Sequence, residues 1–360
     1  SSIYLKYIYL SKTDDLFNKD ELSILKKHAD RYQIQNLEIV KEVLHIDKIF
    51  KENNLNPVYL KGIALMNEYE DISLRPLNDI DILFKEDEIF DAFEILKNNG
   101  YKEYRNIQLS QSELIDYSKE RHHLPELCRN TNIMIELHHR VTSIKDFKKC
   151  PLSHKILNEK ISFDFYGIRI FKPNLNDLIV HLILHYSFQN FFHNSLRIFF
   201  DIYQIEKNYN IDWEVVFDSH ENEKIRKAIL LTLSVLNRDF KLIEDFDSFK
   251  NKFSIDFPSD EIIKTCFKRT FDLNKKNIHP KTLLMIDKSN GISIFKVIFK
   301  YIFNFKKITI FDNRITEKNH IKILYFTVIH FFEKIKTSSS SVIQLIIKRG
   351  EVSKDYYSVK

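Results

Sequence analysis

Residues 79–84, which read Asp-Ile-Asp-Ile-Leu-Phe, constrain the fold of this chain more than any other segment. Successive side chains of a strand point to opposite faces, so Asp79 and Asp81 share one face and Ile80 and Ile82 share the other. The apolar face can enter a core, which leaves the two carboxylates together on the opposite face. Two carboxylates one pleat apart repel each other unless a cation lies between them, and Mg²⁺ prefers carboxylate and phosphate oxygens. A pair of ordinary solvated aspartates would also give this pattern.

Strand-like and helix-like stretches alternate around this segment and are separated by turn residues. The expected strands lie at residues 58–60, 80–84 and 132–138, with a hairpin at 161–171 that turns near Tyr166-Gly167. The expected helices lie at residues 63–70 and 86–98, with a turn at Lys61-Gly62 and a helix stop at Asn99-Gly100. We therefore predict an α/β core at residues 56–172.

Helical periodicity dominates both flanks of this core, so the fold class is expected to be α+β. Helices are predicted at residues 21–54, 175–190, 196–207 and 213–236. The predicted organisation is an N-terminal helical segment (1–55), the core (56–172), a helical domain (173–290) and a basic, aromatic-rich helical tail (291–360). The Phe, Ile and Lys stripe at residues 292–307 favours core packing over an amphipathic helix on a membrane surface.

Composition excludes several classes of function. The 360 residues include only 5 glycines and contain no GxGxxG or Walker A pattern, so a Gly-rich dinucleotide or P-loop site is not indicated. Three scattered cysteines, Cys128, Cys150 and Cys266, form no CxxC pair, which indicates neither a zinc site nor a disulfide framework. No apolar stretch is long enough for a membrane span, and lysines interrupt the short apolar run at the beginning of the sequence. We expect a cytoplasmic location, and the net charge of +5 is compatible with polyanionic partners.

The run LKGIAL at residues 60–65 followed by LRPLNDIDILF at 74–84 resembles the uncharacterised nucleotidyltransferase family of the DNA polymerase β-like superfamily. The superfamily pattern is a Gly-containing turn, an Asp-hydrophobic-Asp pair on the next strand and a third carboxylate on a later strand. Gly62, the pair Asp79 and Asp81, and Glu136 match these positions. HHLPEL at 122–127, IELHHR at 135–140 and residues 178–205 are also similar to the family. The resemblance implies a polymerase β-like core with a small mixed sheet, flanked by N-terminal helices and a C-terminal helical region.

The resemblance also implies an activity, the metal-dependent transfer of a nucleoside monophosphate from a nucleoside triphosphate, with ATP as the expected nucleotide. Asp79, Asp81 and Glu136 would be the catalytic residues and the ligands of two Mg²⁺ or Mn²⁺ ions. Two alternatives stay open, a non-catalytic binding module of the same fold and the transfer of another phosphoryl or pyrophosphoryl group. The sequence does not identify the acceptor, for which a small molecule, a peptide, a protein and an RNA end all stay open. It does not identify the oligomeric state either.

Lys61, Gly62 and Arg75 are the expected nucleotide-binding residues. The family's Lys61-Gly62-Ile63 replaces the usual Gly-Ser or Gly-Gly turn, so Lys61 is expected to supply charge to the phosphates in place of a serine contact. Gly62 would leave backbone N–H groups free to meet a phosphate, and Arg75 could contact a triphosphate bidentately. The corresponding structural alternatives are a solvated lysine, a plain turn glycine and a salt bridge.

Five histidines are candidates to line a cleft between the core and the helices after Pro173: His122, His123, His138, His181 and His185. His138 shares a strand face with Glu136 and could orient a carboxylate. Asp177, His181 and His185 share one helix face, but the Glu of an HExxH zinc motif is missing. We therefore favour a hydrogen-bonded helix interface there, with Asp201 as a candidate partner. Arg197 is expected on the acceptor side of the cleft.

Overall fold

The computed structural model describes residues 18–271 except 105–108, 130–132, 143–150, 191, 193–196, 241–242, 244 and 254–257. The chain divides into two compact units, and most of the first is described. The first unit comprises Ser1–Tyr104, Gln108–Gln189 and Leu196–Ile229, and the second comprises Arg105–Ile107, Asn190–Ser195 and Leu230–Lys360. The tail predicted at 291–360 lies outside the described residues.

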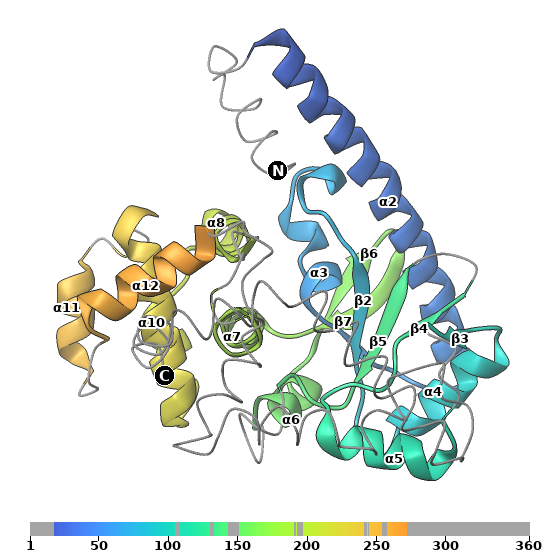
Figure 1. Cartoon of the computed structure of the whole chain (residues 1–360). Coiled ribbons are helices and arrows are strands. Elements are labelled where there is room, and N and C mark those ends of the chain that lie inside the picture. The colour runs from blue at the N-terminus through green and yellow to red at the C-terminus, as the bar shows by residue number, and fades with distance from the viewer. Residues whose placement is uncertain are drawn as a thin grey trace, which may run out of the picture. The chain divides into compact units, whose positions relative to one another are not determined.

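A seven-stranded mixed sheet forms the centre of the first unit, in the order β3-β4-β5-β2-β1-β7-β6 (Figure 1). Its strands are β1 (Val58–Tyr59), β2 (Asp79–Leu83), β3 (Lys102–Glu103), β4 (Leu127–Cys128), β5 (Met134–His138), β6 (Ile161–Phe165) and β7 (Ile168–Lys172). β2 and β5 are parallel neighbours, and β1 is antiparallel to β2 and parallel to β7. The mixed sheet with its helices agrees with the α+β class predicted from the sequence.

The helices of the first unit include one long N-terminal helix and several shorter ones. They are α2 (Lys19–Glu52), α3 (Lys61–Ala64), α4 (Ile89–Asn98), α5 (Gln111–Glu120), α6 (Pro151–Asn158), α7 (Leu175–Leu184), α8 (Arg197–Tyr209), α9 (Trp213–Asp218) and the first part of α10 (Glu223–Phe240). Short 3₁₀ turns η2 (Met66–Glu68) and η3 (Ile72–Leu74) follow α3, and a π-helical turn η4 (His185–Gln189) follows α7.

The apolar face of β2 is the face that enters the core, as the alternating pattern predicts. Ile80 and Ile82 are fully buried and pack in one cluster with residues of α2 and α4. Burying such a side chain contributes roughly 1.5–3 kcal/mol relative to leaving it in water. Because the strand alternates, this packing holds Asp79 and Asp81 on the other face of the sheet.

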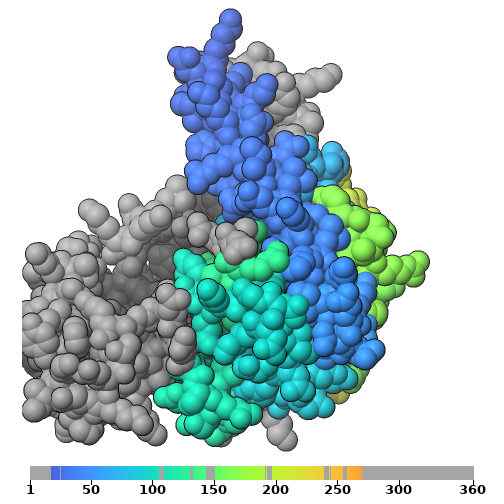
Figure 2. Space-filling model, turned by 90° about the vertical axis from the view of Figure 1, so that its right-hand side faces the viewer, coloured from blue at the N-terminus to red at the C-terminus, as the bar shows by residue number. Residues whose placement is uncertain are grey.

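Helix α2 begins and ends close to the limits that its apolar spacing predicts. Asn18 and Glu21 form a reciprocal capping box at its first turn, which satisfies two backbone N–H groups that a helix start leaves unpaired. The helix continues to Glu52 and is followed by Asn54 with a positive φ of 60°. Its first turns carry mostly exposed side chains and extend beyond the other coloured elements (Figure 2).

The predicted hairpin between β6 and β7 is confirmed. Tyr166 and Gly167 form its two-residue turn with φ values of 49° and 86°. Positive φ at both central residues is the type I′ geometry, whose twist suits an antiparallel pair. Gly100, with φ of 88°, ends α4 where the Asn-Gly stop signal predicts.

Several elements differ from the sequence-based predictions. The helix expected at 63–70 is the single turn α3 with two 3₁₀ turns, and the helix expected at 175–190 becomes π-helical at His185. The helix expected at 213–236 is two helices, because the Asn222 side chain accepts from the N–H groups of Lys224 and Ile225 and begins α10 anew. The short strands β3 and β4 and the helices α5 and α6 were not predicted.

The described part of the second unit is helical. It contains the second half of α10, α11 (Phe246–Lys252) and α12 (Asp260–Phe271). Arg238 of α10 lies over the ring of Phe267 of α12, 4.7 Å from its centroid. Among the described helices of both units, none combines the length and the apolar character needed to cross a bilayer.

Candidate active site

The turn after β1 presents Lys61 in an unusual backbone conformation. Lys61 has a φ of 43°, which L-amino acids rarely adopt, whereas Gly62 does not have a positive φ. Gly62 is required for a different reason: a Cβ there would lie 2.5 Å from Leu77 Cδ2 and 2.9 Å from Arg75 Nη1. The glycine of the motif therefore permits close packing, and the unusual conformation belongs to the lysine.

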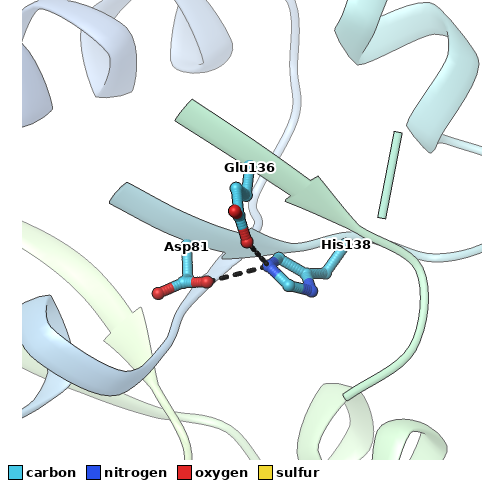
Figure 3. A group of neighbouring side chains, drawn as sticks. All are labelled: Asp81, Glu136 and His138. Carbon is cyan, nitrogen blue, oxygen red and sulfur yellow. Dashed lines mark hydrogen bonds and ion pairs between the residues drawn. The ribbon is translucent and has the colours of Figure 1, made fainter. Parts of the chain in front are cut away.

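Asp81, Glu136 and His138 converge on one point on the carboxylate face of the sheet (Figure 3). Asp81 of β2 lies directly opposite Glu136 of the parallel strand β5, and His138 is two residues further along β5 on the same face. His138 Nε2 donates to Asp81 Oδ1 at 2.9 Å and lies 3.2 Å from Glu136 Oε2. The register of two strands thus assembles a group whose members lie far apart along the chain.

Lys61 brings a second positive charge to the same carboxylate. Its Nζ donates to Asp81 Oδ1 at 2.6 Å, and the side chain is only 14% exposed. Burial disfavours the charged amine, but Asp81, Glu136 and Asp79 together raise the pKa of Lys61. The lysine is therefore an ion-pair partner of Asp81, and the solvated-lysine alternative does not describe it.

The carboxyl groups of the site titrate differently because their neighbours differ. Burial and the charge of Asp81 raise the pKa of Asp79 to about 6, although Lys61 opposes the rise. Burial also opposes ionisation of Asp81, but Lys61 and the hydrogen bond from His138 hold the pKa of this carboxyl well below its usual range. Burial likewise opposes ionisation of Glu136, yet the hydrogen bond from His138 lowers its pKa. Asp81 and Glu136 are accordingly ionised at neutral pH.

The five candidate histidines all lie near Lys61 or the Asp81 cluster. The rings of His122, His123 and His138 have centroids 4.8–5.4 Å apart. His123 Nδ1 donates to the carbonyl of Leu124, and burial lowers the pKa of His123. His138 differs from the other four, because its two carboxylate neighbours raise its pKa despite burial.

The two histidines of the predicted helix at 175–190 are largely withdrawn from water and neutral. His181 is fully buried, neither of its ring nitrogens has a hydrogen-bond partner among the described residues, and burial holds its pKa well below the usual range. His185 bonds to Gln189 of the π-helical turn, and burial lowers its pKa to about 3. The charges of Lys61 and Asp81 act on the pKa of both histidines, so this helix face lies beside the site. The predicted hydrogen-bonded interface of Asp177, His181 and His185 is wrong for His181.

Arg75 forms the salt bridge that was its structural alternative. Its Nε and Nη2 donate to Asp201 at 2.7 and 3.0 Å, and Tyr69 donates to the same carboxylate at 2.5 Å. Asp201 is therefore the partner of Arg75 and not, as the sequence predicted, of the α7 histidines. Arg197, at the first turn of α8, is exposed, and its charge acts on Asp79.

The oxygen and nitrogen donors of the cluster suit a divalent cation. The donor atoms of Asp81, Glu136 and His138 all lie within 4.8 Å of one another, and so do those of His123, Glu126 and Glu136. The 2.9 and 3.2 Å separations are those of the protonated His138 Nε2 from the two carboxylates. A cation here would therefore be held by the carboxylate oxygens, and His138 would become a ligand only after losing this proton. Neither group includes Asp79, which lies at the beginning of β2, or Asp177, His181 and His185.

Sequence reasoning missed three residues that contact these side chains: Tyr69, Glu126 and Gln189. Gln189 lies 3.3 Å from both His122 Nε2 and the Val141 carbonyl. Glu126 stands in the HHLPEL stretch, so its neighbourhood was identified although its carboxylate was not. Nothing local in the sequence marks Tyr69, because its partner Asp201 lies far along the chain. Gln189 stands four residues after His185, a spacing that could have identified this contact.

Comparison with known proteins bears on this arrangement. The family described as an uncharacterised nucleotidyltransferase matches residues 6–241, which is more than half of the chain and covers every candidate site residue. No curated protein matches the chain. The chain thus belongs to the family of uncharacterised nucleotidyltransferases.

Proposed function

We propose that this protein transfers a nucleoside monophosphate from a nucleoside triphosphate to an acceptor, on a polymerase β-like core. The observation that carries the proposal is the pairing of Asp81 with Glu136 in register across two parallel strands, with Asp79 one pleat away. That arrangement supports the proposal, because the superfamily that the motifs resemble has three carboxylates at these positions. Family membership supports nucleotidyl transfer in general, and the rest is our inference.

Asp79, Asp81 and Glu136 are the residues that would hold Mg²⁺ or Mn²⁺. Carboxylate oxygens are the ligands that both ions prefer, and Asp81 and Glu136 already converge. A divalent cation at this position supplies charge neutralisation for the triphosphate and lowers the pKa of an attacking hydroxyl. His138 holds Asp81 and Glu136 in position through its Nε2.

Other side chains of the site have roles in binding and proton transfer. Glu136 is ionised and its side chain is 18% exposed, so it can accept the proton of an acceptor hydroxyl. Arg197 is exposed and its charge acts on Asp79, so we assign it to the phosphates, while Arg75 is held by Asp201. The release of pyrophosphate completes the transfer. ATP is the expected nucleotide, and the acceptor is a small molecule, a peptide, a protein or an RNA end.

A non-catalytic binding module is the competing function, and one observation favours it. Asp81 is already neutralised by Lys61 and His138 inside the protein, so the carboxylate face is stable without an added cation. Nucleotide binding without turnover would be the signature of such a module. The two functions are separated by product formation.

The test is incubation of the protein with each labelled nucleoside triphosphate, Mg²⁺ or Mn²⁺ and candidate acceptors. We expect a product heavier by one nucleoside monophosphate, released pyrophosphate, and loss of both in Asp81→Asn. Asp87→Asn is the matched control, because it makes the same substitution at an exposed position after the strand. Wild-type transfer in Asp81→Asn would contradict the proposal. Absence of nucleotide binding at millimolar concentration would contradict both functions.

A further inference from the structure

The Lys61 ammonium is an ion-pair partner of Asp81 within the carboxylate group. It donates to Asp81 Oδ1 at 2.6 Å, and Asp79 and Glu136 are also among the charges that act on it. The side chain is largely withdrawn from water. An ammonium paired with Asp81 supplies positive charge to a carboxylate that would otherwise need a metal ion.

The backbone supports this placement of the side chain. Lys61 adopts a left-handed φ of 43°, although it is followed by a glycine that could have taken the positive φ itself. Non-glycine residues in this region of φ and ψ are strained and occur preferentially at functional sites. The Leu60 N–H donates to the Asp81 carbonyl at 2.9 Å and so joins the residue before Lys61 to β2. This bond fixes the position of the backbone from which the Lys61 side chain extends.

The hydrogen bonds of Asp81 limit how many ions it can bind. Its Oδ1 accepts from both Lys61 Nζ and His138 Nε2, which uses the two lone pairs of that oxygen. Only Oδ2 is then left without a donor among the described residues. A carboxylate that bridges two ions normally gives one oxygen to each, and Asp81 can do so only if Lys61 leaves.

We propose that the Lys61 ammonium takes the place of one of the two divalent cations, so that the site binds a single divalent cation through Asp81 and Glu136. This inference rests on the proposed function, and it changes the two-ion expectation drawn from the sequence. Lys61 is then a permanent cation of the site, present before nucleotide binds. The one exchangeable ion is the one that the activity requires.

Manganese alone is the probe for the test, because its binding can be counted by equilibrium dialysis and seen by electron paramagnetic resonance. We expect one Mn²⁺ per chain in the wild type and in Lys61→Arg, which keeps the charge. Lys61→Met, which removes the charge at similar length, is expected to bind two Mn²⁺ with the spectrum of a spin-coupled pair. Lys85→Met is the matched control and is expected to bind one, because Lys85 is exposed and pairs only with Glu88 among the described residues.

Each outcome decides the inference. Two ions in the wild type, or one ion or none in Lys61→Met with an unchanged thermal unfolding transition, would overturn it. If Lys61→Met does not fold, the counts in the wild type and in Lys61→Arg decide, since two ions in either contradict the inference. If the proposed metal-dependent function is wrong, the result is different, because neither the wild type nor Asp81→Asn then binds Mn²⁺.

Discussion

Gly62 lies against Leu77 and Arg75 with no room for a side chain. Since a Cβ would lie 2.5 Å from Leu77 Cδ2, Gly62→Ala must displace a buried leucine or the neighbouring guanidinium. We expect the free energy of unfolding to fall by about 1–3 kcal/mol, as overpacked cores usually show. Urea denaturation followed by circular dichroism measures this change.

Gly100 and Gly167 provide controls for a different cause of glycine preference. Both have a positive φ, and apart from their chain neighbours no atom of the described residues lies within 4 Å of the position that a Cβ would take. Backbone conformation, and not space, therefore limits substitution at these two positions. Asn tolerates the left-handed region better than most residues do. Gly100→Asn should therefore be nearly neutral while Gly62→Asn is strongly destabilising, and equal effects at both positions would contradict the packing argument.

His181 is a buried polar side chain without a partner among the described residues, which is costly for stability. Both of its ring nitrogens lack hydrogen bonds there, and the side chain is fully buried. An unsatisfied buried polar group costs about 1–3 kcal/mol, so His181→Leu should raise the melting temperature. If the imidazole serves the proposed activity, the same variant should lose transferase activity.

Thr232→Val is a reference for that measurement. Thr232 is also fully buried with an oxygen that lacks a partner in the described part of the chain, but it belongs to the second unit. The Thr232→Val variant should be more stable than the wild type and should keep its activity. A His181→Leu variant less stable than the wild type would indicate that the imidazole has a partner, such as an ordered water.

At the scale of elements, the Arg75–Asp201 ion pair joins the chain after η3 to helix α8. Both side chains are almost fully buried. Breaking a buried pair by removing one partner leaves an uncompensated charge and typically costs about 3–5 kcal/mol. Asp201→Asn should therefore lower the free energy of unfolding by about 3 kcal/mol or more.

Asp218→Asn is the control for the ion pair. Asp218 is exposed and pairs with Arg226 at the surface, so its loss should change stability by less than about 1 kcal/mol. Thermal and urea unfolding of both variants checks the difference. Similar small effects in the two variants would show that Arg75 finds another partner or water.

The elements that the sequence predicted correctly are those whose signals are local. The alternation in β2 and the Tyr166-Gly167 turn each depend on adjacent residues, and the structure confirms both. Period two placed Asp79 and Asp81 on one face, and the family resemblance added Glu136 to them, although the register of their strands was not predicted. The pairing of β2 with β5 has to be formed by the whole sheet.

What the sequence could not predict depends on distant partners or on competition between conformations. Asp201 was assigned to the histidines of its own helical region, but the Arg75 guanidinium, 126 positions away, binds it bidentately. The amino-acid composition around His185 does not indicate the change to a π-helical turn there. Gly62 was interpreted as a turn residue whose backbone N–H groups meet a phosphate, and the packing constraint that the Leu77 side chain imposes on it was not predicted.

At the scale of the whole molecule, the candidate site is confined to one unit. The residues that carry it run from Lys61 to Asp201, and all of them fall in the ranges of the first unit. The family match ends at residue 241, one position after α10 ends at Phe240. The described site residues and the family match thus both end before residue 242.

A chain that stops after Phe240 should retain the site. It keeps every strand of the described sheet, α7 and α8, and the complete α10, so we expect Mn²⁺ to bind with the same stoichiometry and affinity as in the full chain. Its stability should fall, because Leu233 and Leu236 of α10 are buried in the full chain and belong to the second unit. A chain that stops after Ile229 interrupts α10 and is the comparison, expected to be less stable still. Manganese titration together with thermal unfolding measures both properties, and loss of Mn²⁺ binding by a folded 1–240 chain would show that the second unit contributes to the site.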